Sequence, residues 1–335
     1  MTSTASDGSS SLALPVLDDA LDARLRAQFA LVEARLEREI RSEAPFVTEA
    51  ARHLLHAGGK RFRPALVLLA AEVGDPSAAG VVTAACVVEL THLASLYHDD
   101  VMDEADLRRG AESANSRWDN HVAILTGDFL FAKSSLLTAE LGADAVRIQS
   151  ETFTKLVEGQ ILETLTPEGD PLEHYLRVVQ GKTGSLIATS AQYGARFSGA
   201  PLEVEEALTA YGERVGMAFQ LSDDILDIGS ESAQSGKTPG TDLREGVPTL
   251  PVLLAQRSTD PGDARLLELL AGDLDDDALH GEALGLLRRH PAMEEARAYV
   301  LGIATEAQEL LKVLPEGPAR DALDAFAVLI ATRTA

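Results

Sequence analysis

Residues 81–103 read VVTAACVVELTHLASLYHDDVMD, and this stretch decides the fold. Val81–His98 is apolar on nearly every helical face, and a helix that is hydrophobic all round lies in a core. Asp99, Asp100 and Asp103 follow this run directly. We therefore expect a helix that stays buried up to the point where three carboxylates appear.

A second stretch of the chain repeats this design. The helical pattern Val204–Asp227 ends in SDDILD and contributes Asp223, Asp224 and Asp227. In both clusters the first and last Asp are four residues apart, which places their carboxylates on one helix face. Like charges at this spacing destabilise a bare helix, so a cation is expected to compensate them.

Magnesium suits such clusters, because it prefers oxygen ligands and is typically held by one or two carboxylates together with substrate phosphates. A single cluster could be a solvated helix end in so acidic a chain. Two clusters, each at the end of a long apolar helix, instead predict that they face one cavity and hold a diphosphate through Mg²⁺.

The rest of the chain is also expected to be helical, because it is rich in Ala, Leu, Glu and Arg and its apolar residues recur at helical spacing. The further helices predicted are Leu21–Ile40, Ala65–Val73, Val122–Leu141, Ala145–Thr164, Leu172–Arg196 and Met293–Leu311. Alternating strand patterns with hairpin turns are absent from the sequence. We predict a disordered tail at residues 1–15 and one all-α domain at residues 16–335.

Composition narrows the class of protein. The chain has 335 residues, 53 acidic against 29 basic, and a net charge of −24, which disfavours nucleic-acid binding. The excess acid, including Asp273–Asp277, is expected on solvated surface. Cys86 is the one cysteine, so neither an intrachain disulfide nor a Cys-based zinc cluster is possible. The sequence shows no secretory signal and no run approaching the roughly 18 uncharged apolar residues of a membrane span, so we expect a cytoplasmic protein without a membrane anchor.

Basic residues are scarce and gather at a few motifs. The segment GGKRFRP at residues 58–64 places Lys60, Arg61 and Arg63 beside two glycines. Glycines let backbone N–H groups approach an anion, and Lys and Arg neutralise phosphate oxygens. The spacing is not that of a Walker P-loop.

Four more cations and one histidine accompany the clusters. They are Arg108 and Arg109 after the first cluster, Lys182 in a KTG segment that interrupts a helical stretch, Lys237 after the second cluster, and His92. His92 lies seven and eleven residues before Asp99 and Asp103, within about 20° of one line on a helix. Each basic motif alone could be a surface patch, and His92 a core residue. Jointly they predict a cavity for two anions and metal.

In this order, GGKRFRP, DDVMD with RRG, KTGSL, and FQLSDDILD with GKTPGTDL resemble the trans-isoprenyl diphosphate synthases of the polyprenyl synthetase family. The resemblance covers about Gly58 to Pro251. It implies an isoprenoid synthase class I helix bundle with a central active-site cavity. It also implies a Mg²⁺-dependent prenyltransferase that condenses isopentenyl diphosphate head-to-tail with an allylic diphosphate to an all-trans polyprenyl diphosphate. Three Mg²⁺ ions in the site and a homodimeric state are implied as well.

The resemblance also assigns roles to residues. Asp99 and Asp103, assisted by Asp100, would hold Mg²⁺ against the allylic diphosphate. Asp223, Asp224 and Asp227 would hold a further Mg²⁺ from the opposite wall. Arg108, Lys182 and Lys237 would neutralise the allylic diphosphate. The diphosphate of isopentenyl diphosphate would be bound by Lys60, Arg63, His92 and Arg109. Thr183 and Gln220 would line the reacting centre.

One departure from the family pattern follows the second cluster, where Val247-Pro248 stands in place of a common Lys. Product length in the family is set by bulk just before the first Asp motif, where this chain has Ala94 and Ser95. Small residues there favour a medium- or long-chain product. Alternatively they serve helix packing while Phe129 or Phe131 supplies a deeper floor, and geranylgeranyl diphosphate is the second product considered.

Two rival functions remain at this point. A class I terpene cyclase shares the fold and the first Asp motif, but it would carry a different second motif and would not need GGKRFRP. A helical scaffold or regulatory subunit has no use for paired Asp clusters.

Overall fold

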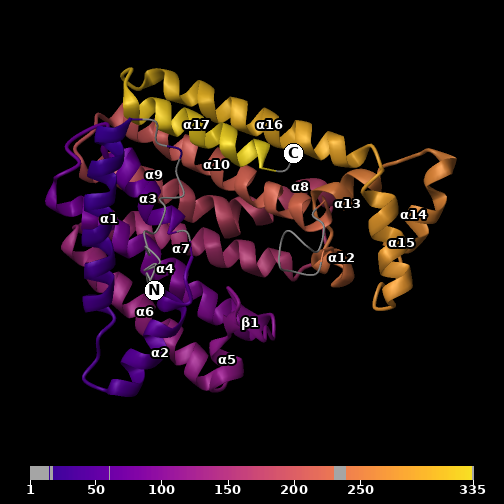
Figure 1. The fold of residues 1–335 in the computed structure, drawn as a ribbon, viewed down its shortest axis with the longest axis horizontal. Coiled ribbons are helices and arrows are strands. Elements are labelled where there is room, and N and C mark those ends of the chain that lie inside the picture. The colour runs from indigo at the N-terminus through magenta and orange to yellow at the C-terminus, as the bar shows by residue number, and fades with distance from the viewer. Residues whose placement is uncertain (1–14, 16–17, 60, 230–238, 334–335) are drawn as a thin grey trace, which may run out of the picture. The chain divides into compact units, whose positions relative to one another are not determined.

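The computed structural model describes residues 15, 18–59, 61–229 and 239–333, and it is helical almost throughout (Figure 1). Within these residues the only strands are the antiparallel pair β1 (Leu107–Arg108) and β2 (Ala111–Glu112). The prediction of an all-α fold is confirmed. Residues 1–14 of the expected tail lie outside the described residues.

The chain divides into two compact units. The first comprises residues 1–149, 189–205 and 314–322, and the second comprises residues 150–188, 206–313 and 323–335. Four helices contribute residues to both units: α7 (Ala143–Glu163), α9 (Ser185–Phe197), α10 (Leu202–Gly229) and α17 (Pro318–Thr332). The expectation of a single domain stays a prediction.

Helix α4 (Ala79–Met102) is the centre of the first unit. Almost every residue from Val81 to Tyr97 is buried, as its all-round apolar pattern predicts. It packs on α3 and α6. The other elements wholly within this unit are α1 (Asp19–Glu39), α2 (Pro45–His56), α3 (Phe62–Ala71), α5 (Ala114–Arg117) and α6 (Asn120–Glu140).

The second unit consists of α8 (Pro171–Val179), η1 (Gln180–Gly184), α12 (Thr241–Arg244), α13 (Leu250–Ala255), η2 (Pro261–Asp263), α14 (Ala264–Leu270), α15 (Asp277–Leu287), α16 (Ala292–Leu310), η3 (Leu311–Val313) and its parts of the four shared helices. In Figure 1 the α14–α15 pair is drawn in orange. The C-terminal part of α17 is joined to α16 by a 3.0 Å hydrogen bond from Gln308 to Asp324.

Part of the excess acid has a local structural use. Asp18, Asp119, Asp170 and Asp276 each accept a backbone N–H in the first turn of the helix that follows. A side-chain cap of this kind stabilises a helix start by about 1 kcal/mol. Asp276 belongs to the run Asp273–Asp277, whose acids are exposed as expected but which also begins α15.

The predicted helices match the structure closely, with one informative difference. Leu172–Arg196 was expected as one helix interrupted at KTG, but the backbone there continues as the π-helical turn η1 between α8 and α9. Glycines let α7 approach this turn, since a Cβ at Gly181 would lie 2.8 Å from the carbonyl O of Lys155. A π turn inserts an extra residue and frequently occurs at functional sites.

Two helices, α4 and α6, are long and apolar enough to cross a membrane by length and composition. Neither is an uncharged run, because Glu89 lies within α4 and Asp128 and Lys133 lie within α6. The apolar window of α4 is 72% buried inside the protein, as expected of a core helix. The window of α6 is only 39% buried, so this helix presents an apolar face to solvent.

Candidate active site

The first Asp motif lies where α4 ends. Asp99 and Asp100 are in its last turn and Asp103 caps it, with the Asp103 N–H donating to the carbonyl O of Asp99 at 2.8 Å. Asp103 is exposed and Asp99 half-buried. The structure therefore places the two predicted metal ligands of this motif one helical turn apart at the surface end of a buried helix.

Asp100 differs from its neighbours because it is fully buried. Its Oδ1 accepts a hydrogen bond from Arg108 Nε at 2.6 Å, and its Oδ2 is buried without a hydrogen-bond partner. Burial raises the pKa of Asp100 above its ordinary value, and the Arg108 guanidinium opposes this rise. Arg108 also lies 4.0 Å from Asp103, so it contacts two carboxylates of the first Asp motif.

The basic residues of the GGKRFRP segment have different surroundings. Lys60 lies outside the described residues. Arg61 caps α3 in the left-handed region at φ 45° and turns inward, where it pairs with Glu89 at 2.8 Å and Glu33 at 3.0 Å. Arg61 is therefore a structural anchor between α1, α3 and α4. The sequence prediction counted it among the cations beside the glycines but gave it no ligand.

Arg63, His92 and Arg109 affect one another electrostatically, and the site that they are expected to share stays a prediction. Burial lowers the pKa of Arg63 to about 10, with a smaller contribution from Arg109, so Arg63 remains a cation at neutral pH. Burial lowers the pKa of His92 well below its ordinary value, and the charges of Arg63 and Arg109 lower it further. His92 is thus a neutral imidazole whose pKa is influenced by two guanidinium groups.

Arg109 is held against the loop that carries the two glycines. Its Nη1 donates to the carbonyl O of Gly58 and, at 3.4 Å, to that of Leu54. A Cβ at Gly59 would lie 2.6 Å from Nη1 of Arg109, and the φ of Gly59 is +125°. Only glycine suits this position, because a side chain would displace Arg109.

The two chain-length positions differ in packing. Ala94 is fully buried, and a Cβ at Gly127 of α6 would lie 3.1 Å from its carbonyl O. Ser95 is 9% exposed, and its hydroxyl donates to the carbonyl O of His92 at 2.9 Å. The ring of Phe131, a predicted alternative floor, lies 5.6 Å from that of His98. Phe129 lies 5.3 Å below the Lys133 ammonium.

The second Asp motif occupies the last two turns of α10 in the second unit. Asp227 accepts the backbone N–H groups of Thr241 at 3.3 Å and Asp242 at 3.2 Å, at the start of α12. Asp223 is half-buried and pairs with Arg333 at 2.7 Å. Lys237, predicted to bind the allylic diphosphate, lies outside the described residues.

Asp224 is the buried member of this motif. It accepts hydrogen bonds from Tyr175 Oη and, at 3.0 Å, from Gln220 Nε2. Burial raises the pKa of Asp224 well above its ordinary value, and neighbouring carboxylates such as Asp242 and Asp227 raise it further. Asp224 in the second motif and Asp100 in the first are therefore the buried carboxylates of the two motifs.

The structure brings Thr183 and Gln220 together, and their place at a reacting centre stays a prediction. Thr183 Oγ1 donates to Gln220 Oε1 at 3.2 Å, and Gln220 in turn donates to Asp224. Lys182 pairs with Glu163 at 2.6 Å. The π turn thus presents a lysine and a hydroxyl next to each other, with the hydroxyl connected to the second Asp motif.

Sequence reasoning missed Tyr175 and Arg333. Both contact the second Asp motif from distant parts of the chain, 49 and 110 residues away from their partners. Neither residue stands in a motif. The only available signal was the expectation that the like charges at residues 223–227 need cationic compensation.

Both motifs fit Mg²⁺ by their donor chemistry. Their carboxylate oxygens are its preferred ligands, and Asp100 Oδ2 is a buried acceptor without a partner. Among the residues that the structure describes, no three His, Cys, Asp or Glu side chains converge as in a preformed structural metal site. One or two carboxylates completed by water and phosphate are typical for Mg²⁺, so the residues present fit this ion.

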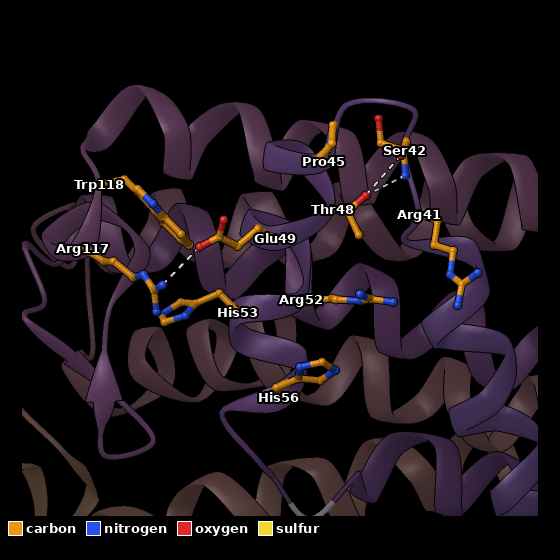
Figure 2. Close-up of a pocket in the computed structure, with 10 residues that line it drawn as sticks. All are labelled: Arg41, Ser42, Pro45, Thr48, Glu49, Arg52, His53, His56, Arg117 and Trp118. Carbon is orange, nitrogen blue, oxygen red and sulfur yellow. Dashed lines mark hydrogen bonds and ion pairs between the residues drawn. The ribbon is translucent and has the colours of Figure 1, made fainter.

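A surface cavity of about 750 Å³ also lies in the first unit, between α2, α5 and the loop before α2 (Figure 2). Its lining residues are Arg41, Ser42, Pro45, Thr48, Glu49, Arg52, His53, His56, Arg117 and Trp118. Most of its basic groups are compensated: Arg117 pairs with Glu49 at 3.2 Å, and Arg52 pairs with Glu37 at 3.1 Å. None of the predicted site residues lines it, so we do not include it in the active site.

Comparison with known proteins identifies relatives along nearly the whole chain. A family model described as polyprenyl synthetase matches residues 44–286. Nonaprenyl diphosphate synthase from Mycobacterium tuberculosis is 51% identical over 312 residues, which cover 92% of this chain and 93% of that protein. Dimethylallyltranstransferase from the same organism is 43% identical over 297 residues, or 87% of this chain and 90% of that protein.

Solved structures of prenyl diphosphate synthases share the fold of this chain. Geranylgeranyl pyrophosphate synthase from Corynebacterium glutamicum, complexed with calcium and isoprenyl diphosphate, superimposes with a TM-score of 0.88 at 45% identity, covering 96% of this chain and 99% of that one. A decaprenyl diphosphate synthase from Rhodobacter capsulatus gives a TM-score of 0.86 at 36% identity, covering 95% and 99%. The predicted class I isoprenoid synthase fold is confirmed.

Proposed function

Because the chain belongs to the polyprenyl synthetase family, we propose that it joins isopentenyl diphosphate head-to-tail to an allylic diphosphate and releases an all-trans polyprenyl diphosphate of medium or long chain. It is a prenyltransferase that elongates prenyl chains. The observation that carries the detailed proposal is the pair of Asp motifs, each ending a long, largely buried helix. Family membership favours this synthase over the terpene cyclase and the helical scaffold.

The acidic residues would bind the metal. Bound Mg²⁺ supplies Lewis-acid chemistry, which makes the allylic diphosphate a better leaving group. Asp99 and Asp103 would provide oxygen ligands in the first unit, and Asp223, Asp224 and Asp227 in the second. Asp100 holds Arg108 in place, and Asp224 is fixed by Tyr175 and Gln220. The crystallised relative with calcium and isoprenyl diphosphate supports a divalent ion beside a diphosphate, and we propose three ions in the site.

The basic residues would bind the two diphosphates. Arg63 and Arg109 would neutralise the phosphate oxygens of isopentenyl diphosphate, together with Lys60. His92 would donate one hydrogen bond as a neutral imidazole, because the pKa of His92 is lowered by burial and by these arginines. Lys182, Arg108 and Lys237 would neutralise the allylic diphosphate.

The reaction then follows from charge. The allylic C–O bond breaks, the diphosphate leaves with the electron pair, and the isopentenyl double bond attacks the allylic cation to form the new C–C bond. Loss of a proton to the released diphosphate regenerates the alkene. Thr183 and Gln220 would direct oxygen dipoles at the passing cation, because their hydrogen bond fixes both side chains.

Two observations bear on product length. Ala94 and Ser95 are small residues just before the first Asp motif, and the nonaprenyl synthase relative is 51% identical. Both favour a medium or long product. Geranylgeranyl diphosphate remains the second candidate, since the structure from Corynebacterium glutamicum belongs to a geranylgeranyl pyrophosphate synthase at 45% identity.

We also propose a homodimer in the cytoplasm. Leu125 and Leu136 of α6 are 66% and 64% exposed. They are eleven positions apart in the sequence, so they lie on one face of the helix, within about 20°. A second copy of the chain would cover this face.

The test is direct. The protein is incubated with Mg²⁺, isopentenyl diphosphate and either farnesyl or geranylgeranyl diphosphate, and the products are sized by mass spectrometry. Elongated diphosphates are expected from the wild type, and none from folded Asp99→Asn or Asp223→Asn. Hydrocarbon formed from the allylic substrate alone would indicate a cyclase instead. Absence of turnover by the wild type would sink the proposal.

A further inference from the structure

The second Asp motif has a cationic partner from the end of the chain. Arg333, one residue beyond α17, places a guanidinium nitrogen 2.7 Å from Oδ1 of Asp223 and 2.6 Å from the carbonyl O of Phe219. Its guanidinium carbon lies 4.2 Å from the centroid of the Phe219 ring. Three contacts with little more than one turn of α10 therefore fix this cation over the first carboxylate of the motif.

The helix that carries Arg333 is docked on α10 by other contacts. Tyr211 Oη donates to the carbonyl O of Leu323 at 2.7 Å, and Ser222 Oγ donates to that of Ile330 at 3.0 Å. These bonds use the backbone of α17 and do not involve the Arg333 side chain. A substitution at residue 333 should therefore leave α17 in place.

Arg333 lies beside a group of carboxylates whose negative charges it can partly neutralise. Asp223, Asp224 and Asp227 lie within two turns of one helix, and Asp242 and Glu163 add to the negative charge at Asp224. Without metal these carboxylates repel one another. Arg333 supplies one positive charge, and its Nε is buried without a hydrogen-bond partner. The contacts of the Arg333 guanidinium are thus with Asp223 and Phe219.

We propose that Arg333 is a positioning residue that acts as the counter-ion of Asp223 before metal binds. The inference rests on the proposed role of Asp223 as a metal ligand. If Arg333 stays when the metal arrives, it repels the divalent ion. If it leaves, its ion pair with Asp223 is lost. Both routes weaken metal binding to this motif and stabilise the metal-free protein, so the sign of the effect does not depend on which occurs.

The experiment measures metal affinity without substrate. Mn²⁺ binding to the full chain is followed by electron paramagnetic resonance of the free ion, for wild type and Arg333→Gln. Mn²⁺ should bind the second Asp motif more tightly in Arg333→Gln than in the wild type, so its dissociation constant should fall about three- to tenfold. The melting temperature in EDTA should fall as well, and Arg333→Lys should restore both values in part.

Arg214→Gln is the matched control. Arg214 lies on α10, the helix that carries the second Asp motif, and pairs with Glu306 at 2.9 Å. Its replacement removes the same charge at a position distant from the motif. This control should leave the dissociation constant unchanged. Unchanged or weaker Mn²⁺ binding by Arg333→Gln overturns the inference, as does an equal gain in the control. If Asp223→Asn leaves Mn²⁺ binding intact, the metal role of Asp223 fails instead, and the two failures are thereby distinguished.

Discussion

Arg108 and Asp100 form an ion pair across the turn that follows α4, with Nε 2.6 Å from Oδ1. Asp100 is fully buried, whereas the side chains of Arg108 and Asp103 are 29% and 52% exposed. The middle carboxylate of the first motif is therefore buried and paired within the protein, whereas the side chain of Asp103 is exposed to solvent. This division between a buried and an exposed carboxylate falls within five residues of the chain.

Replacing Asp100 by Asn should consequently cost stability as well as activity. Arg108 would lose its buried partner, and we expect unfolding to become easier by about 1–3 kcal/mol, as judged by chemical denaturation. Asp103→Asn is the matched control: it should abolish turnover yet change stability by less than about 0.5 kcal/mol, because its contact is exposed and long. Equal stability losses in both variants would contradict the division.

The neutral state of His92 predicts a pH dependence of stability. Its pKa is depressed in the folded protein, so below about pH 6.5 the unfolded chain binds a proton that the folded chain does not. Stability should therefore fall as the pH drops from about 6.5 toward the lowered pKa. His92→Gln should remove part of this slope, which denaturation at pH 7.5 and 5.5 would reveal. An unchanged slope would show that His92 is protonated in the folded state.

The sequence allowed prediction of the elements whose signal is local. The ends of α4 and α10 were predicted well because an apolar run stops at carboxylates spaced by one turn. The π turn at Lys182 was noticed only as an interruption, since its form depends on Gly181 packing against α7. The local sequence pattern thus indicated where the candidate site lies, and packing determined its backbone conformation.

Long-range pairing could not be predicted in the same way. Arg61 and Arg63 are chemically alike and two residues apart, but Arg61 turns inward because Glu33 and Glu89 meet it from two other helices. Arg333 reaches Asp223 across 110 residues. Such partners are set by tertiary contacts, and a single sequence carries no signal of which cation meets which acid.

The hydrogen bond between Thr183 and Gln220 predicts an effect on kcat. Thr183→Val keeps the shape of the side chain but removes the hydroxyl, so Gln220 Oε1 loses its donor. We expect kcat to fall roughly tenfold with little change in KM, since the lost dipole acts on the developing cation. Thr183→Ser retains the donor and should keep most of the rate. A change confined to KM would assign the pair to substrate binding.

Ser95 and Ala94 should respond differently to bulk. Ser95→Phe is expected to shorten the products, and Ser95→Ala should leave their lengths unchanged, as measured by mass spectrometry. Ala94 is fully buried, so Ala94→Phe should instead overpack the core and cost about 1–3 kcal/mol of stability. If Ser95→Phe leaves the distribution unchanged, the floor lies elsewhere, and Phe129 and Phe131 become the next residues to vary.

The exposed face of α6 makes the proposed homodimer testable without catalysis. Leu125 is 66% exposed on a helix whose apolar window is mostly unburied, and a charge there would be trapped in the interface of two copies. Leu125→Glu should therefore shift the sedimenting species from dimer to monomer in analytical ultracentrifugation. Leu202→Glu adds the same charge at a position that is 64% exposed on α10 and should leave the dimer intact. Dissociation by both variants would point to general charge repulsion, and a dimer that survives Leu125→Glu would move the interface away from this face.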